Sequence, residues 1–268
     1  MAGKEAVIII PFYKTTLTAY ENIALDRCFK TLSRHNIIAI KPRSLTMPAE
    51  TGQYTFTGVV SFDDDFFVNI QGYNRLMMSE VFYGAFLDYK YILIHQLDVF
   101  VFKDELQEWC SQNWDYIGAP WIRSYIYPDF VKKLKCQLLI YYHKRVNTQV
   151  NGVPIDEQFY YQVGNGGFSL RNTHKFYDLC QKLQPQIALY NSHTEHQYNE
   201  DAFWSLEVNR KKKRLKIPGY KRALKFSIEF QPERAMDINN NVLPFGCHAW
   251  DLYIDFWKPI IEQYGYKL

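Results

Sequence analysis

Four short stretches of this chain carry residue types that can do chemistry on phosphates and hydroxyls. In the first, Gln96 and Asp98 interrupt the apolar segment 91–102, YILIHQLDVFVF. A polar break in an apolar strand costs free energy unless it lies at the carboxyl edge of an open α/β sheet, where such folds hold ligands. We therefore interpret Asp98 as a carboxylate that handles a metal ion or a diphosphate.

The second stretch is the densest glycine cluster of the chain, VGNGGFSLRN at residues 163–172. A loop without Cβ atoms lets the backbone approach a ligand closely. No lysine follows at the spacing of a P-loop, so a phosphate cradle of that type is disfavoured.

The remaining two stretches supply acids and an imidazole. Glu200 and Asp201 open a predicted helix, and His248 lies in the C-terminal part. Each has an ordinary structural explanation, because acids favour the N-terminus of a helix and a lone histidine is more often structural than a ligand. The adjacent aspartates 63–65 are expected to form a solvated turn or a helix cap.

Composition limits the classes of protein that this chain can belong to. Its 268 residues contain no repeat, linker or low-complexity segment, which favours a single domain. A net charge of +3 is too small to indicate a nucleic-acid binder. Five scattered cysteines without a CxxC pair predict free thiols and no zinc site. With no signal peptide or spanning segment in the pattern, we expect a cytoplasmic protein and leave peripheral contact with the inner face of a membrane open.

The elements that must position these groups follow an α/β pattern. Apolar strands are predicted at residues 6–13, 36–42 and 56–62, with a helix at 15–32 capped near Thr16 and another at 73–87. Strand, helix and strand with short joins indicate a parallel sheet with right-handed crossovers. We expect residues 1–102 to form a nucleotide-binding half and 103–268 an acceptor and catalytic half.

An insertion near residues 122–155 fits no sheet pattern. It contains a predicted helix with lysines opposite an apolar face, formed by Phe130, Val131, Leu134, Leu138 and Leu139. Either this is a surface helix packed on the core, or it is an interfacial patch near a lipid-linked acceptor. The basic run 210–216, RKKKRLK, is expected to be solvated or to meet an anionic partner.

Taken in order, the four stretches resemble the DxD motif, glycine-rich loop, xED motif and C-terminal histidine of the GT-A nucleotide-sugar glycosyltransferases. The chain is most similar to a group of inferred glycosyltransferases described mainly as a domain of unknown function. That resemblance covers about residues 73–250 and rests on YILIHQLD, DYIGAPW, VGNGGFSLRN, NEDAFW, ALKFSIE and PFGCHAW. It implies a Rossmann-like α/β/α sandwich of three layers with a mainly parallel central sheet.

The resemblance also implies roles for individual residues. Asp98 and His248 would bind Mn²⁺ or Mg²⁺, while Gln96 stands where the first acid of DxD usually lies and removes one carboxylate. Asp201 would be the general base, with Glu200 beside it. The donor sugar and acceptor would meet the loop Asn165, Gly166 and Gly167, together with Trp250. From their location alone, Pro11, Tyr13, Asn74 and Arg75 are expected to contact the nucleotide.

The implied activity is transfer of a sugar from a nucleotide-diphosphate sugar to a glycan or a lipid-linked acceptor, as in polysaccharide biosynthesis. UDP is the favoured nucleotide by analogy. Inversion at the anomeric carbon is preferred, with a retaining enzyme as the alternative. A non-catalytic nucleotide- or carbohydrate-binding module is a further alternative.

Overall fold

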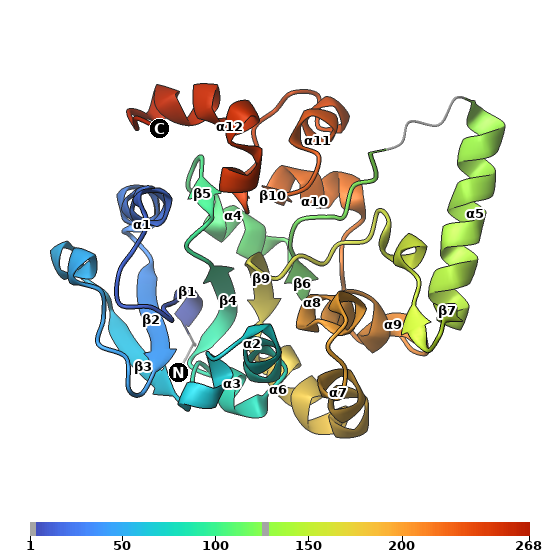
Figure 1. Cartoon of the computed structure of the whole chain (residues 1–268), viewed down its shortest axis with the longest axis horizontal. Helices are drawn as coiled ribbons and strands as arrows, with labels where there is room; N and C mark the ends of the chain where they lie inside the picture. Colours follow the sequence, from blue (N-terminus) through green and yellow to red (C-terminus); the bar gives the residue numbers. More distant parts are fainter. Residues whose placement is uncertain (1–3, 125–128) are drawn as a thin grey trace.

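A six-stranded sheet forms the centre of the computed structural model, which describes residues 4–124 and 129–268 (Figure 1). The strand order is β3-β2-β1-β4-β9-β6. The first four strands in this order are parallel, and β9 runs antiparallel to both of its neighbours. The strands are β1 (Lys4–Pro11), β2 (Asn36–Pro42), β3 (Gly58–Phe62), β4 (Tyr89–His95), β9 (Phe168–Asn172) and β6 (Tyr116–Ile117). The predicted mainly parallel α/β sheet is confirmed.

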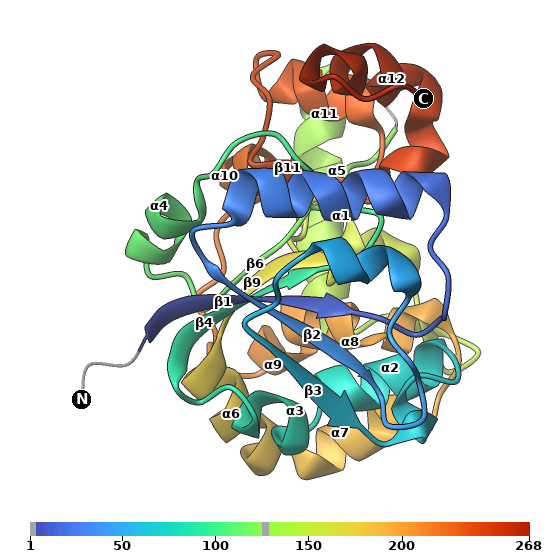
Figure 2. The same cartoon turned by 90° about the vertical axis from the view of Figure 1, so that its left-hand side faces the viewer.

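Helices cover both faces of this sheet, which explains why its central strands are continuous apolar runs (Figures 1 and 2). In β1, Val7 and Ile9 pack on one face, while Ile8 and Ile10 pack on the other. The first face is covered by α2 (Ile70–Met77), α3 (Glu80–Gly84), α6 (Thr173–Lys182) and α7 (Gln184–Asn191). The second is covered by α1 (Ala19–Leu32), α4 (Leu106–Ser111) and α10 (Tyr220–Phe226). The result is an α/β/α sandwich of three layers.

Two helices begin where the sequence analysis did not place them. The cap of α1 is Thr18 rather than Thr16, because Thr18 forms a capping box with Glu21. The single helix predicted at 73–87 is two helices, since the Ser79 side chain accepts a hydrogen bond from the Phe82 amide and starts α3. The aspartates at 63–65 are exposed and lie at a 3₁₀ turn, as expected for solvated acids.

A second sheet of three very short strands lies beyond the end of β4. It contains β5 (Phe100–Val101), β11 (Gly246–Cys247) and β10 (Ser227–Ile228) in the order β10-β11-β5. The helices α11 (Pro232–Ile238) and α12 (Ile254–Ile261) complete this part, which has a core of its own around Phe100, Trp250 and Trp257. Segments far apart in the sequence therefore meet at the edge of the main sheet.

The insertion near residues 122–155 consists of α5 (Phe130–Val146) and a hairpin of β7 (Gln149–Val150) and β8 (Val153–Pro154). The helix stands at the edge of the molecule, away from the central sheet (Figure 1). The apolar residues of this helix, Phe130, Val131, Leu134, Leu138 and Leu139, are exposed. The alternative prediction that this face packs on the core is therefore wrong. Within the described residues, no helix is both long and apolar enough to cross a lipid bilayer.

Candidate functional site

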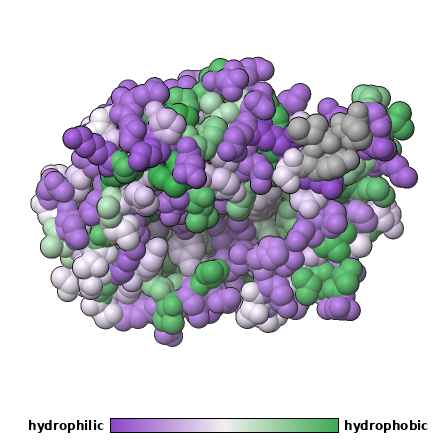
Figure 3. All heavy atoms as spheres, turned by 45° about the horizontal axis from the view of Figure 1, so that its top comes forward, coloured by the Kyte–Doolittle hydropathy of each residue, from purple (hydrophilic) through white to green (hydrophobic). Residues whose placement is uncertain are grey.

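A cavity of about 870 Å³ lies where β1 and β4 end. A hollow is visible near the middle of the face drawn in Figure 3. Every site residue predicted from the sequence lines this cavity except Arg75. These are Pro11, Tyr13, Asn74, Gln96, Asp98, Asn165, Gly166, Gly167, Glu200, Asp201, His248 and Trp250. The cavity is within the size range of sites that hold small molecules.

Arg75, a predicted nucleotide contact, lies outside the cavity, and so do the aromatic residues Phe12 and Trp204. Arg75 is exposed, and its Nη2 donates to the Asp65 carbonyl oxygen at 3.0 Å. Phe12 is buried beside Phe56 and does not line the cavity. Trp204 is buried too, and its indole N–H donates to the Met77 carbonyl oxygen at 3.1 Å. The structure therefore places these side chains in the scaffold.

His248 joins the acidic and amide groups that follow β4. Its Nε2 lies 3.1 Å from Oδ1 of Asp98 and 3.1 Å from Oε1 of Gln96. Its Nδ1 lies 3.2 Å from Oε1 of Glu229. The imidazole thus has a carboxylate on each side, one of which, Asp98, borders the cavity at the end of the strand.

The short three-stranded sheet creates this cluster. Cys247 pairs with Phe100 on one side and with Ile228 on the other. The residues that follow β11 and β10 are His248 and Glu229, so the ladder places them next to each other. Two residues before β5, on the other side of His248, lies Asp98. Residues separated by up to 150 positions are brought together by hydrogen bonds between strands of two residues.

The charges of this cluster are strongly coupled. Burial alone would lower the pKa of His248, but the carboxylates of Asp98 and Glu229 raise it to about 10. Burial alone would raise the pKa of Asp98, but the imidazolium lowers it overall. The cluster therefore holds a charged imidazolium between two carboxylates when no other cation is present.

The same donor atoms fit a divalent ion. At the Mg²⁺ bond length of about 2.0–2.1 Å, neighbouring ligands of an octahedral ion lie about 3 Å apart, which matches the spacing of His248 Nε2 to both oxygens. Glu229 would orient the ring from Nδ1, as carboxylates behind metal-bound histidines do. Within residues 4–124 and 129–268, no three His, Cys, Asp or Glu side chains are spaced to hold a metal. Gln96 and groups from outside the chain would have to complete the coordination.

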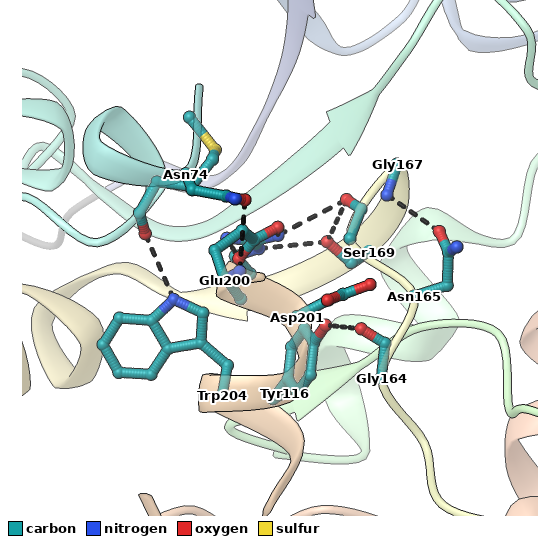
Figure 4. Close-up of polar contacts among 12 residues, drawn as sticks. Asn74, Tyr116, Gly164, Asn165, Gly167, Ser169, Glu200, Asp201 and Trp204 are labelled. Atoms are coloured by element: carbon teal, nitrogen blue, oxygen red, sulfur yellow. Dashed lines mark hydrogen bonds and ion pairs between the residues drawn. The ribbon is translucent and has the colours of Figure 1, made fainter. Parts of the chain in front are cut away.

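Glu200 is held in a buried ion pair. Arg171 donates from Nη2 to Oε1 at 2.9 Å and from Nη1 to Oε2 at 3.0 Å. Arg171 itself is fully buried, and it also donates to the Tyr83 hydroxyl at 2.9 Å. The Glu200 amide donates to Oδ1 of Asn74 at 3.1 Å (Figure 4). These contacts fix the first turn of α8 (Glu200–Ala202), where a three-residue helix has little stability of its own.

Asp201 shares that turn but points in another direction, towards the loop that carries Asn165 (Figure 4). It lines the cavity, and Oδ1 accepts a hydrogen bond from the Ala202 amide at 2.7 Å. Burial, followed by the nearby charge of Glu200, raises the pKa of Asp201 to about 8. A carboxylate with a pKa near the working pH is suited to exchange a proton with a ligand.

The glycine-rich loop lies against both clusters. The backbone N–H of Gln96 donates to the Gly167 carbonyl oxygen at 3.0 Å, and the backbone N–H of Gly167 donates to Oδ1 of Asn165 at 2.9 Å. A Cβ atom at Gly167 would overlap Nε2 of His248, and one at Gly166 would overlap Oε1 of Glu200. Glycine is required here because polar side chains occupy the space of a Cβ.

Several lining residues were missed from the sequence. Glu229 lies within the motif ALKFSIE, but a single acid in an apolar stretch gave no sign that it faces a histidine. Val68 and Ile70, both exposed, line the cavity beside Tyr73. No periodic pattern marks this segment, because it joins a 3₁₀ turn to α2.

A family model described as protein of unknown function, DUF5672, matches residues 56–248. The chain belongs to this family. The region of the match to DUF5672 includes Asp98, the glycine-rich loop, Glu200, Asp201 and His248. None of the curated proteins matches the chain.

Solved structures show which fold this DUF5672 protein has. It is similar to mouse xyloside xylosyltransferase 1 in its apo form, with a TM-score of 0.52 and 11% identity over 91% of this chain and 97% of that one. It is also similar to the galactosyltransferase LgtC in complex with donor and acceptor sugar analogues, with a TM-score of 0.51 and 13% identity over 90% and 86% of the two chains. The fold is that of the GT-A glycosyltransferases.

Proposed function

We propose that this protein transfers a sugar from a nucleotide-diphosphate sugar to a hydroxyl group of a glycan or a lipid-linked acceptor. One observation carries the proposal. In a GT-A fold, Asp98, His248 and Asp201 converge on a single cavity from three distant parts of the chain. The two similar proteins are named as a xylosyltransferase and a galactosyltransferase, which supports the same class of reaction here.

The charge of the cavity supports a metal-assisted reaction. Its wall contains six acids, Glu21, Asp98, Glu200, Asp201, Glu229 and Asp251, and two cationic side chains, Lys14 and His248. Lys14 is the lysine in that wall, and its Nζ is paired with Oε1 of Glu21 at 2.7 Å. A diphosphate would be repelled by this wall unless a cation accompanied it. We propose that this cation is Mn²⁺ or Mg²⁺, held by Asp98, His248 and Gln96. The ion would neutralise charge on the departing diphosphate.

Asp201 is the proposed general base. The acceptor oxygen forms a bond to the anomeric carbon while the bond from that carbon to the diphosphate oxygen breaks, and the hydroxyl proton passes to Asp201. Its raised pKa makes the carboxylate basic enough to accept this proton. Glu200 was a second catalytic candidate; because it is paired with Arg171, we propose that it holds the turn in place instead.

The donor would enter over the ends of β1 and β4. Pro11 and Tyr13 follow β1, and the half-exposed Tyr13 ring offers a surface for the base. Asn165, Gly166 and Gly167 line the cavity together with Asp201 and are the proposed contacts of the donor sugar. We propose UDP as the nucleotide and inversion as the stereochemical course.

The test is a thermal-shift screen of nucleotide sugars with and without Mn²⁺, followed by transfer assays with the best donor. We expect UDP-sugar binding that needs Mn²⁺, and transfer that Asp201→Asn reduces by about 10²–10⁴-fold with nearly unchanged donor affinity. Asp237→Asn, an exposed acid far from the cavity wall, is the matched control.

Three results separate the alternatives. Wild-type turnover in Asp201→Asn would refute the base assignment. Donor binding without transfer or donor hydrolysis would favour a binding module over an enzyme. The anomeric proton coupling of the product, measured by NMR, distinguishes inversion from retention.

A further inference from the structure

α5 contacts the rest of the protein through one side only. Ile140 is its buried residue, and its main neighbour is the 3₁₀ turn Asp156–Phe159. The helix therefore lies at the edge of the molecule, and most of its residues are exposed to solvent (Figure 1).

The side facing away from Ile140 is apolar. It carries Phe130, Val131, Leu134, Leu138 and Tyr142. Phe130 and Val131 are 75% and 73% exposed, and Leu138 is 61% exposed. Hydrophobic side chains are visible at the right-hand edge of the molecule, where α5 lies (Figure 3). A contiguous apolar face of this kind in a folded protein marks a surface that another body covers.

The helix that carries this apolar face, and the segment 210–216 beside it, are rich in positive charge. α5 contains Lys132, Lys133, Lys135, Lys144 and Arg145, and the segment 210–216 adds six more cations. Together they carry eleven of the 31 Lys and Arg residues of the chain and none of its 28 Asp and Glu residues. The remainder of the chain is therefore acidic, and the positive charge is concentrated here.

The helix and the basic run form one surface. Nη1 of Arg145 donates to the Arg210 carbonyl oxygen at 2.7 Å, and the guanidinium of Arg210 donates to the Lys144 carbonyl oxygen. These reciprocal contacts hold the start of residues 210–216 against the last turn of α5. We call α5 and residues 210–216 the basic apolar face.

The cleft between α5 and the body extends this charge inward. A cavity of about 560 Å³ is lined by Lys133, Lys144, Lys221 and Arg234, and by no acid. Among the residues that the structure describes, none of these four cations forms an ion pair with a carboxylate. Lys144 Nζ donates to Oε1 of Gln162 at 3.0 Å, and no carboxylate of this cleft competes with an anionic group from outside.

We propose that the basic apolar face docks the protein on an anionic membrane surface. The apolar side of α5 would enter the boundary between headgroups and acyl chains, while the lysines and arginines meet lipid phosphates and carboxylates. A second copy of the chain is a poorer occupant, because it would bring the same eleven cations against this face. Nucleic acid would satisfy the cations but leave the aliphatic side chains in water. This proposal does not depend on the proposed sugar transfer.

The experiment measures sedimentation of the full chain with vesicles of phosphatidylcholine, with and without phosphatidylserine. We expect binding only to the anionic vesicles, and weaker binding at high salt. The double variant Leu134→Ser/Leu138→Ser and the triple variant Lys211→Gln/Lys212→Gln/Lys213→Gln should each weaken binding by at least about tenfold. All five positions are exposed, so the thermal midpoint should not change.

Matched controls make equal changes elsewhere on the exposed surface. Val81→Ser/Leu189→Ser removes two other apolar side chains, and Lys90→Gln/Lys175→Gln/Lys258→Gln removes three other cations. Both controls should bind vesicles like the wild type. Absence of binding to anionic vesicles, or equal losses in test and control variants, would overturn the proposal. A dimer that forms in solution and is lost in Leu134→Ser/Leu138→Ser would identify a second copy as the occupant instead.

Discussion

The guanidinium of Arg171 binds both carboxylate oxygens of Glu200, at 2.9 and 3.0 Å, where the Arg171 side chain is fully buried and that of Glu200 is 5% exposed. Arg171 lies in β9 and Glu200 starts α8, so this ion pair connects the central sheet to the turn that carries Asp201. Burial lowers the pKa of an arginine, but Glu200 raises that of Arg171 above its usual value. The Arg171 guanidinium is therefore charged throughout the physiological pH range.

Breaking this pair should be costly. Arg171→Met leaves a buried carboxylate without its partner, and we expect the free energy of unfolding to fall by about 3–5 kcal/mol. The double variant Arg171→Met/Glu200→Leu should lose less than the sum of the single changes, with a coupling of about 1–3 kcal/mol in urea unfolding. The exposed pair of Asp178 and Lys182 is the control, with an expected coupling of at most about 0.5 kcal/mol. Equal couplings in the two pairs would contradict this assignment.

The raised pKa of Asp201 predicts a pH dependence of stability. The folded-state pKa is about 8, and the ordinary value is 3.8. Between these values the folded chain binds a proton that the unfolded chain has lost, so the contribution of Asp201 to stability decreases as pH rises. Asp201→Asn should therefore gain stability relative to the wild type between about pH 5 and about pH 8.

Urea unfolding of the wild type and Asp201→Asn at both pH values checks this prediction. Asp237→Asn, which changes an exposed acid, should follow the wild type. A constant difference between wild type and Asp201→Asn across this range would show that Asp201 does not titrate there.

The side-chain amide of Gln96 is uncharged, so it adds no negative charge next to His248. Gln96→Asp would place a second carboxylate next to Nε2, where Oε1 now lies at 3.1 Å. We expect Mn²⁺ to bind at least about tenfold more tightly, because added ligand charge increases affinity for hard cations. Calorimetric titration with Mn²⁺ measures this directly, without any sugar donor. Asn69→Asp adds the same charge to the cavity wall at the cap of α2 and should leave the affinity nearly unchanged.

Gly167 provides space for the same cluster. A Cβ atom there would overlap Nε2 of His248 and lie 2.6 Å from Oε1 of Gln96. Gly167→Ala should displace both side chains and weaken Mn²⁺ binding by about 10–100-fold, as changes around metal ligands do. Gly52→Ala is the control, since nothing lies within 4 Å of its added atom. Equal affinities in the two variants would exclude a metal site at His248.

The parts of the fold that follow a regular pattern were predictable. The strands of the parallel sheet include long apolar runs, and the residues that follow β1 and β4 line the cavity. Asp98 could be found because it breaks an apolar run, and the loop because glycines cluster there, whereas the role of Asp201 was implied by the resemblance to GT-A glycosyltransferases.

Other features carry no such signal. The strands β5, β10 and β11 have two residues each, too few for an alternation, and they alone bring Glu229 to His248. Arg171 lies in the strand FSLRN, where a charged residue suggests an exposed position, yet its partner comes 29 positions later. The sequence also left two alternatives for the apolar face of α5. Helical spacing shows which residues share a face, but it does not show what that face contacts.

The three-stranded sheet that aligns Asp98, Glu229 and His248 has few hydrogen bonds, since no strand in it exceeds two residues. Such ladders open more readily than the long strands around β1. A cation bound by both Asp98 and His248 would connect β5 to the segment after β11. Binding in the cavity would then stabilise the folded state of the last forty residues. Donor binding and resistance of the C-terminal segment to proteolysis should then rise together.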